Sequence, residues 1–135
     1  MIPPTKPSSS TPPSFEEVRA FLQQLHAKIE SYGLVFKEDA KNKNRRALVG
    51  LNEMGIRPSD RRGYIMRLTP FDYCQGPFND LDNPPPGKGD LWVFGQLIGR
   101  TDYYIKVQIG AFSQTPVCVS FHEVEKSPLR RAFTV

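Results

Sequence analysis

The side chains of this chain that are best suited to chemistry lie on two runs with the alternation of β-strands, residues 103–109 and 117–122. Successive side chains of a strand point to opposite faces, so the apolar residues of each run predict a buried face and the others a polar face. The polar face is expected to collect a phenol, an ammonium, an amide, a thiol, a hydroxyl and an imidazole, from Tyr104, Lys106, Gln108, Cys118, Ser120 and His122.

Three of these groups could act together on a phosphodiester. If the two runs pair, Tyr104 and Lys106 become neighbours of Ser120 or His122. His122 would then transfer a proton, Lys106 would stabilise negative charge and Tyr104 would present a positioned hydroxyl. This interpretation requires the three side chains to lie within about 8 Å on an open surface. The alternative interpretation is an ordinary solvated sheet face.

The cysteine and histidine content argues against a metal centre. Cys118 and His122 are four residues apart, which in an extended strand separates their side chains by roughly 13 Å, at about 3.3 Å per residue, too far for one ion. His26 and Cys74 are the other histidine and cysteine of the chain. We therefore predict no metal site and no cofactor.

The positive charge is unevenly distributed. The chain has a net charge of +4 and a pI of about 9.2, a mild preference for an anionic partner. Between positions 41 and 67 the only acids are Glu53 and Asp60, against eight basic residues: Lys41, Lys43, Arg45, Arg46, Arg57, Arg61, Arg62 and Arg67. This distribution predicts a local basic patch.

Composition also suggests a cellular compartment. Two widely spaced cysteines lack the dense pattern of a secreted disulfide scaffold, which favours a reducing cytoplasm. No apolar run approaches the ~20 residues of a membrane span, and the amino terminus lacks the apolar core of a signal peptide. We expect a soluble cytoplasmic protein without a membrane partner.

The first half of the chain is predicted to be helical. Residues 1–14 are rich in proline and serine and are expected to form a disordered tail, followed by one domain at 15–135. Ser14 and Glu17 form a capping-box signature ahead of a helix of about four to five turns, which Gly33 ends. Residues 34–37 are a short extended candidate. A second helix is predicted to end at Met54, which would face inward, and a third to open at Pro58.

The second half is predicted to form the sheet. Thr69, Pro70 and Asp72 repeat a helix-start signal, so a short fourth helical turn is expected to carry Tyr73, Cys74 and Gln75. Residues 76–89 read as a long ordered loop, and residues 91–98 as the first strand of a three-stranded antiparallel meander. The result is an α+β two-layer domain, with the amino-terminal helices packed on one face of a small antiparallel sheet and the polar face looking outward.

Six local segments occur in an order that resembles a known family. They are 47–48, 51–55, 68–73, 91–94, 104–106 and 119–122. This order resembles the MqsR family of type II toxin–antitoxin toxins, which are messenger-RNA interferases with a RelE-like fold. The likeness covers roughly residues 15–125, and the Tyr-x-Lys and Ser-Phe segments are its most specific parts.

The resemblance implies an endoribonuclease that cleaves single-stranded mRNA by metal-independent attack of a ribose 2′-hydroxyl. Tyr104 falls at the catalytic tyrosine of the family, and His122 falls where the founding toxin has a functional lysine. His122 would be the acid or base, Tyr104 its partner or a phosphate ligand, Lys106 a charge stabiliser and Gln75 a further contact. Gln75 and Val93 depart from a lysine and a glutamine of that toxin, which suggests a subfamily with its own arrangement or a relaxed site.

The remaining expectations concern partners. The side chains expected to bind backbone phosphates are Arg61, Arg62, Arg130 and Arg131, and Tyr73 would either stack on a base or belong to the core. The family implies a cognate antitoxin protein, often a DNA-binding repressor. The competing hypothesis is a non-catalytic RNA- or protein-binding module that retains the fold. A weaker one is a structural subunit that makes protein contacts through its sheet edge or proline-rich loop.

Overall fold

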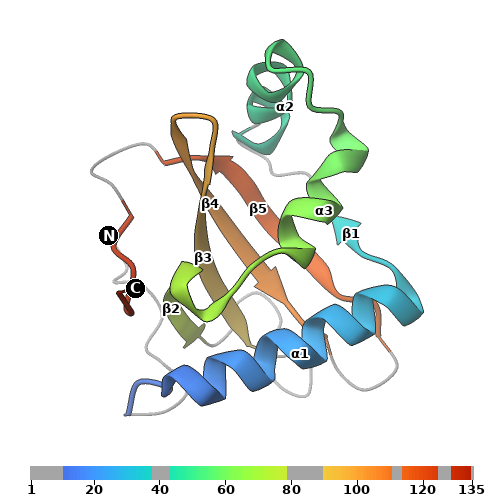
Figure 1. The fold of residues 1–135 in the computed structure, drawn as a ribbon. Helices are drawn as coiled ribbons and strands as arrows, with labels where there is room; N and C mark the ends of the chain where they lie inside the picture. Colours follow the sequence, from blue (N-terminus) through green and yellow to red (C-terminus); the bar gives the residue numbers. More distant parts are fainter. Residues whose placement is uncertain (1–10, 38–42, 79–89, 111–113, 125–128, 135) are drawn as a thin grey trace.

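The computed structural model describes residues 11–37, 43–78, 90–110, 114–124 and 129–134. Within these residues the chain forms three α-helices and a five-stranded mixed sheet, so the predicted α+β architecture is confirmed (Figure 1). Most of the predicted tail and most of the predicted loop at 76–89 lie outside the described residues. None of the described helices is long and apolar enough to cross a membrane.

The first helix, α1 (Phe15–Tyr32), begins and ends where its local sequence predicts. Ser14 Oγ accepts a hydrogen bond from the Glu17 amide at 3.1 Å, and Glu17 Oε1 accepts one from the Ser14 amide at 3.0 Å. Gly33 ends the helix at a φ of 87°, a conformation that glycine adopts without strain. One face of α1 is buried against the sheet, through Val18, Phe21, Leu22, Leu25 and Ile29.

Two shorter helices complete the helical layer. Helix α2 (Lys43–Glu53) is followed by the 3-10 turn η1 (Pro58–Asp60) and helix α3 (Arg61–Met66). Leu51 of α2 and Ile65 of α3 are fully buried. Met54 lies just after α2 and is 44% exposed, so the prediction that it faces inward is wrong.

The sheet has the strand order β1-β5-β4-β3-β2. Strand β1 (Val35–Phe36) pairs in parallel with β5 (Val117–Glu123), whereas β4 (Thr101–Gln108), β3 (Leu91–Ile98) and β2 (Tyr73–Phe78) continue the sheet with antiparallel pairs. The predicted meander is therefore extended by one strand on each side.

Strand β2 corrects the predicted fourth helical turn. The start signal is satisfied, because the Thr69 amide donates to Asp72 Oδ2 at 2.9 Å, but the helical segment η2 covers only Pro70–Asp72. The chain becomes extended at Tyr73, which pairs with Phe94 of β3. Tertiary pairing and burial of the Tyr73 ring thus outweigh the local helix signal.

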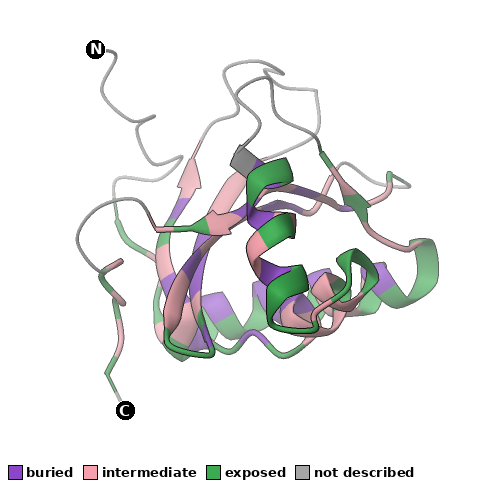
Figure 2. Cartoon of the chain, turned by 90° about the horizontal axis from the view of Figure 1, so that it is seen from above, coloured by how far each residue is buried: buried purple, intermediate pink, exposed green. Residues whose placement is uncertain are grey.

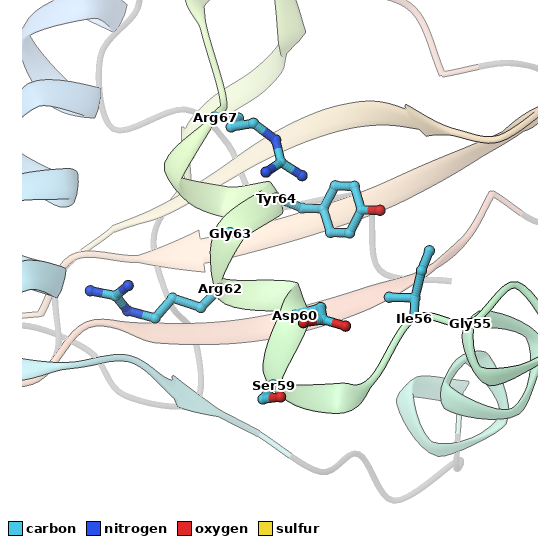
Figure 3. Close-up of a pocket in the computed structure, with 8 residues that line it drawn as sticks. All are labelled: Gly55, Ile56, Ser59, Asp60, Arg62, Gly63, Tyr64 and Arg67. Carbon is cyan, nitrogen blue, oxygen red and sulfur yellow. The ribbon is translucent and has the colours of Figure 1, made fainter.

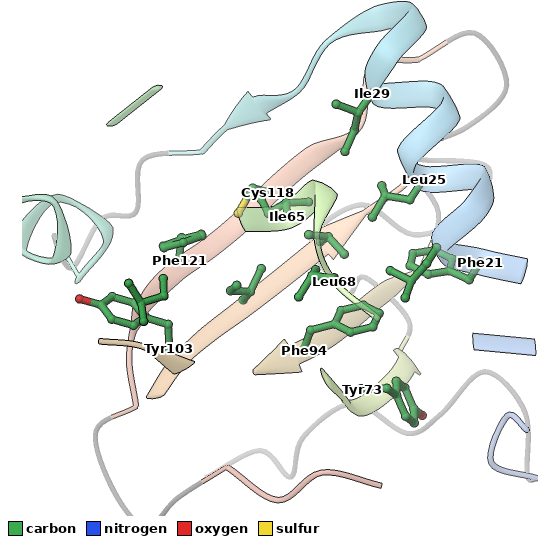
Figure 4. Packing of buried hydrophobic residues seen from close by; sticks show 14 of the residues in the cluster. Phe21, Leu25, Ile29, Ile65, Leu68, Tyr73, Phe94, Tyr103, Cys118 and Phe121 are labelled. Atoms are coloured by element: carbon green, nitrogen blue, oxygen red, sulfur yellow. The ribbon is translucent and has the colours of Figure 1, made fainter. Parts of the chain in front are cut away.

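The hydrophobic core lies between the helical layer and one face of the sheet. Figure 4 shows side chains of α1 and α3 directed toward the strands, and Figure 2 shows the buried residues gathered where the two layers meet. Phe94, Ile105 and Phe121 are cross-strand partners on this face and are at most 1% exposed. The helices therefore cover only the apolar face, as predicted.

A β-bulge in strand β5 changes the predicted alternation. Cys118 pairs with Val107 and Ser120 pairs with Lys106, so Val119 is an extra residue between two consecutive positions of β4. The bulge places Cys118 in the core, where it is 1% exposed. The prediction that Cys118 lies on the polar face is therefore wrong, because the simple alternation assumed no bulge.

The edge of β5 beyond β1 is completed by a side chain. Asn44, at the start of α2, is buried and donates through Nδ2 to Lys37 O at 2.8 Å and to Val119 O at 3.1 Å. Its Oδ1 accepts a hydrogen bond from the Phe121 amide at 3.0 Å. The amide of Asn44 thus takes the place of a neighbouring strand and fixes α2 against β5.

Candidate functional site

The register of the sheet brings the predicted reactive groups together on the face opposite the helices. Tyr104 and His122 are direct cross-strand partners, and their rings are nearly parallel with centroids 5.2 Å apart. Lys106 Nζ lies 5.8 Å from the centroid of the Tyr104 ring, and Lys106 pairs with Ser120. The Tyr104 ring therefore lies within about 6 Å of both the imidazole and the ammonium, inside the separation of about 8 Å that a shared phosphodiester requires of each pair.

The orientation of His122 follows from one hydrogen bond. Its Nδ1 lies 2.9 Å from the carbonyl oxygen of Glu123. A carbonyl only accepts, so we assign the ring proton of the neutral imidazole to Nδ1. This tautomer leaves a lone pair on Nε2. His122 is half-buried, and in this form it can accept a proton through Nε2.

Tyr104 is held in the opposite chemical role. Burial raises the pKa of its phenol above the ordinary value, and the nearby Cys74 contributes in the same direction. A phenol is already neutral at physiological pH, and the shift keeps Tyr104 a neutral hydroxyl, able to donate a hydrogen bond or a proton, to higher pH as well. A phenol that donates beside an imidazole nitrogen that accepts can act as an acid–base pair.

Gln75 lies at the margin of this cluster. It is exposed on β2 and pairs with Val93, whose partner on β4 is Lys106. Two strand spacings of about 4.8 Å separate Gln75 from Lys106, roughly 10 Å in all. Gln75 therefore shares a row of the sheet with Lys106 and lies away from His122.

Arg131 is placed next to Tyr104, but its charge is engaged. Its guanidinium binds both carboxylate oxygens of Asp102, at 2.6 and 3.0 Å, and donates to Leu129 O at 2.7 Å. Both members of this ion pair are mostly buried. The guanidinium lies over Gly95, the cross-strand partner of Tyr104, and a Cβ at Gly95 would overlap it.

This geometry changes the role predicted for Arg131. The carboxylate of Asp102 balances its charge, so it is poorly suited to bind a backbone phosphate. It instead anchors the carboxyl-terminal segment 129–134 over the sheet, where the Ala132 amide also donates to Tyr73 O at 2.9 Å. Arg130, in the same segment, is exposed.

The other predicted RNA contacts lie in other layers. Tyr73 is 4% exposed and its ring packs near Trp92, Phe94 and Phe133, so it belongs to the core and presents no open face to a base. Arg61 and Arg62 belong to α3, in the helical layer on the far side of the sheet. They do not converge with His122 on one phosphate.

A pocket of about 530 Å³ also lies in the helical layer. It is lined by Gly55, Ile56, Ser59, Asp60, Arg62, Gly63, Tyr64 and Arg67 (Figure 3). Figure 3 shows Arg62 directed away from Tyr64, while Asp60 presents a carboxylate on the Tyr64 side. The two arginines therefore do not form a common anion site, and apolar lining is limited to Ile56 and Tyr64.

Three structural features of the site region were not predicted: the close approach at Gly95, the Asp102–Arg131 pair and the Asn44 contacts. Only the first has a recognisable signal in the sequence. A glycine inside a strand pattern indicates close approach of another group, and Gly95 fits that rule through its contact with Arg131. Asp102 and Arg131 are 29 positions apart, and no local pattern connects them. Asn44 likewise acts on residues more than 70 positions away.

Comparison with other proteins adds no assignment. No family model matches the chain, and neither a curated protein nor a solved structure matches it. In the part of the chain that the structure describes, no three His, Cys, Asp or Glu side chains form a group that could hold a metal ion. The functional argument therefore depends on the geometry of the sheet face opposite the helices, here called the open face, where Tyr104, Lys106 and His122 are each partly exposed.

Proposed function

We propose that this protein is an endoribonuclease that cleaves single-stranded mRNA without a metal ion, acting as the toxin of a type II toxin–antitoxin pair. The observation that supports this most strongly is the cluster of Tyr104, Lys106 and His122 on the face that the helices leave uncovered. The likeness to MqsR toxins, a RelE-like fold, a cognate antitoxin and a cytoplasmic location are parts of the same proposal.

The reaction begins with proton removal by His122. Its Nε2 takes the proton of a ribose 2′-hydroxyl, and the resulting 2′-oxygen attacks the adjacent phosphorus. As the bond from phosphorus to the 5′-oxygen breaks, the phenol of Tyr104 gives its proton to that leaving oxygen. The products are a 2′,3′-cyclic phosphate and a 5′-hydroxyl, and solvent returns the proton from the imidazolium to the phenolate.

Charge stabilisation falls to Lys106. The ammonium lies beside the Tyr104 ring, on the strand that carries the proposed acid, so it can face the non-bridging oxygens of the same phosphate. A fixed cation at the developing negative charge lowers the barrier more effectively than solvent does. Gln75 lies in the same cross-strand row as Lys106, on the other side of Val93, and would contact the adjoining nucleotide through its amide.

A second candidate is a non-catalytic RNA-binding module with the same fold. The departure at Val93 favours it, because this side chain is apolar and 1% exposed where the resembling family uses a functional amide. The same basic and aromatic groups would then hold RNA without cutting it. This candidate predicts salt-sensitive binding and no cleavage product at any protein concentration.

Incubation with a defined RNA in the presence of EDTA separates the two candidates. We expect products with 5′-hydroxyl and 2′,3′-cyclic phosphate ends, in unchanged yield when EDTA is added. A matched RNA with 2′-deoxyribose at the cleaved position should remain intact, since it lacks the attacking hydroxyl. Binding of RNA without any product would reject the nuclease in favour of the binding module.

A further inference from the structure

A small cleft lies at the junction of β1, α2 and α3, near the edge of the sheet. It has a volume of about 80 Å³ and is lined by Phe36, Lys37, Asn44, Arg45, Leu48 and Arg61. Three of these six residues are cationic and none is acidic. The volume admits a group about the size of a phosphate and excludes a whole nucleoside.

The guanidinium of Arg61 forms part of the cleft and is held in one position. It lies over the Phe36 ring at 3.9 Å from the centroid, and its Nε donates to Pro58 O at 2.9 Å. Burial lowers the pKa of Arg61, which nevertheless stays charged. Among the described residues no carboxylate is paired with it, and a partly desolvated cation in that state favours an anionic ligand.

The cleft is connected to the candidate site through strand β5. Asn44 lines the cleft and also binds the backbone of Val119 and Phe121. The residues that alternate with these two on β5 are Ser120 and His122, which lie on the open face. The cleft therefore adjoins the β5 edge over the stretch one to four residues from the proposed base, at about 3.3 Å per residue, on the helical side of the sheet.

We propose that this cleft binds a non-scissile phosphate of the RNA substrate, on the stretch of RNA that leaves the Tyr104–His122 cluster across the β5 edge. Lys37 and Arg45 are exposed and supply the outer cations, and Arg61 supplies the inner one. This inference depends on the proposed function only for the identity of the ligand. It also gives Arg61 a phosphate contact separate from the site of cleavage.

The test measures binding separately from cleavage. Binding of a fluorescent single-stranded RNA of roughly twelve nucleotides is followed in a His122→Ala background at several salt concentrations, with Lys37→Ala/Arg45→Ala added. The matched control is Arg19→Ala/Arg100→Ala, which removes the same charge from exposed positions on α1 and in the β3–β4 turn. We expect about tenfold weaker binding from the cleft pair and a salt slope smaller by about 0.7, since the cleft holds one phosphate and each single-strand phosphate contact contributes about 0.7.

A second pair of arms completes the test. Wild-type protein and the Lys37→Ala/Arg45→Ala variant should cut a dinucleotide equally well, because it is too short to reach the cleft. Equal RNA binding by the cleft pair and the control pair would overturn the inference. The Lys37→Ala/Arg45→Ala variant is also tested for binding to a polyglutamate peptide, and loss of that binding with RNA binding unchanged would overturn the inference as well. RNA that binds normally but is never cut would reject the nuclease and leave the cleft measurement valid.

Discussion

The two faces of the sheet differ in how far they bury neighbouring cross-strand rows of β3, β4 and β5. On the helical side, Phe94, Ile105 and Phe121 form a row that is sealed from solvent. One position away on the other side, the row is Gly95, Tyr104 and His122, and the latter two are half-buried. One face of the strands thus packs the core, and the other carries polar groups. Substitutions in the core should therefore lower stability, whereas substitutions of the polar groups should affect the candidate site.

The open face is nevertheless organised by specific contacts. Arg131 and Asp102 close over Gly95, and Asn44 secures the far edge of β5. Tyr104 and His122 therefore lie between the Arg131–Asp102 ion pair on one side and the Asn44 contacts at the β5 edge on the other. Substitutions on the two faces should therefore lower the free energy of unfolding by different amounts. The largest loss is expected in the sealed row, and smaller losses are expected elsewhere.

The largest stability effect is expected from the sealed row. Phe94→Ala removes a ring that is 0% exposed, which should lower the free energy of unfolding by about 3–5 kcal/mol. Leu97→Ala on the same strand is the matched control, because Leu97 is 65% exposed and its loss should cost less than about 0.5 kcal/mol. Urea denaturation measures both, and equal losses would contradict the assignment of the core.

An intermediate effect is expected from the ion pair on the open face. Asp102→Ala leaves the mostly buried guanidinium of Arg131 without its carboxylate, which should cost about 1–3 kcal/mol. Glu16→Ala breaks the exposed pair with Arg19 and should change stability by less than about 0.5 kcal/mol. If the two variants unfold at the same urea concentration, Arg131 does not anchor the carboxyl-terminal segment.

The remaining effect is absent at neutral pH and appears only at alkaline pH, where the Cys118 thiol titrates. Burial raises the pKa of Cys118 to about 12, while an unfolded cysteine loses its proton near pH 8.5, to within about a unit. The folded pKa is the higher one, so this contribution to stability is complete below about pH 8.5 and is lost as the pH rises toward about 12. The loss should be on the order of 1 kcal/mol per pH unit.

The variant Cys118→Ala should therefore show a shallower decline in unfolding free energy between about pH 8.5 and 10 than the wild type. Burial also raises the pKa of Cys74, to about 11, so Cys74→Ala should flatten the decline over the same range, and the two variants should diverge only above about pH 11. Urea denaturation at several pH values supplies the comparison. An unchanged slope in Cys118→Ala would indicate that this thiol is not sealed in the core.

The elements that the sequence predicts well depend on local signals. The capping box of Ser14 and Glu17 and the stop at Gly33 locate α1, and a run of apolar and aromatic residues at 91–94 locates the start of β3. The polar alternation also predicts that Tyr104, Lys106 and His122 share a face. Each of these features is encoded within a few positions of the chain, where side-chain period and backbone preference are sufficient.

The elements that it predicts poorly depend on distant partners. Strand β2 forms because Tyr73 pairs with Phe94, against a local helix signal, and the bulge at Val119 reverses the face of Cys118. The charge of Arg131 suggests a phosphate contact until Asp102 is placed beside it. Register, bulges and ion pairs are tertiary properties, which a reading of local pattern does not contain.

The central claim is that Tyr104 and His122 perform chemistry and do not merely cover the sheet. The most direct measurement is the rate of RNA cleavage by His122→Ala and Tyr104→Phe, with the free energy of unfolding measured on the same preparations. We expect each variant to lose about 10²- to 10⁴-fold in rate while its stability changes by less than about 1 kcal/mol. Cleavage by both variants at the wild-type rate would contradict the claim.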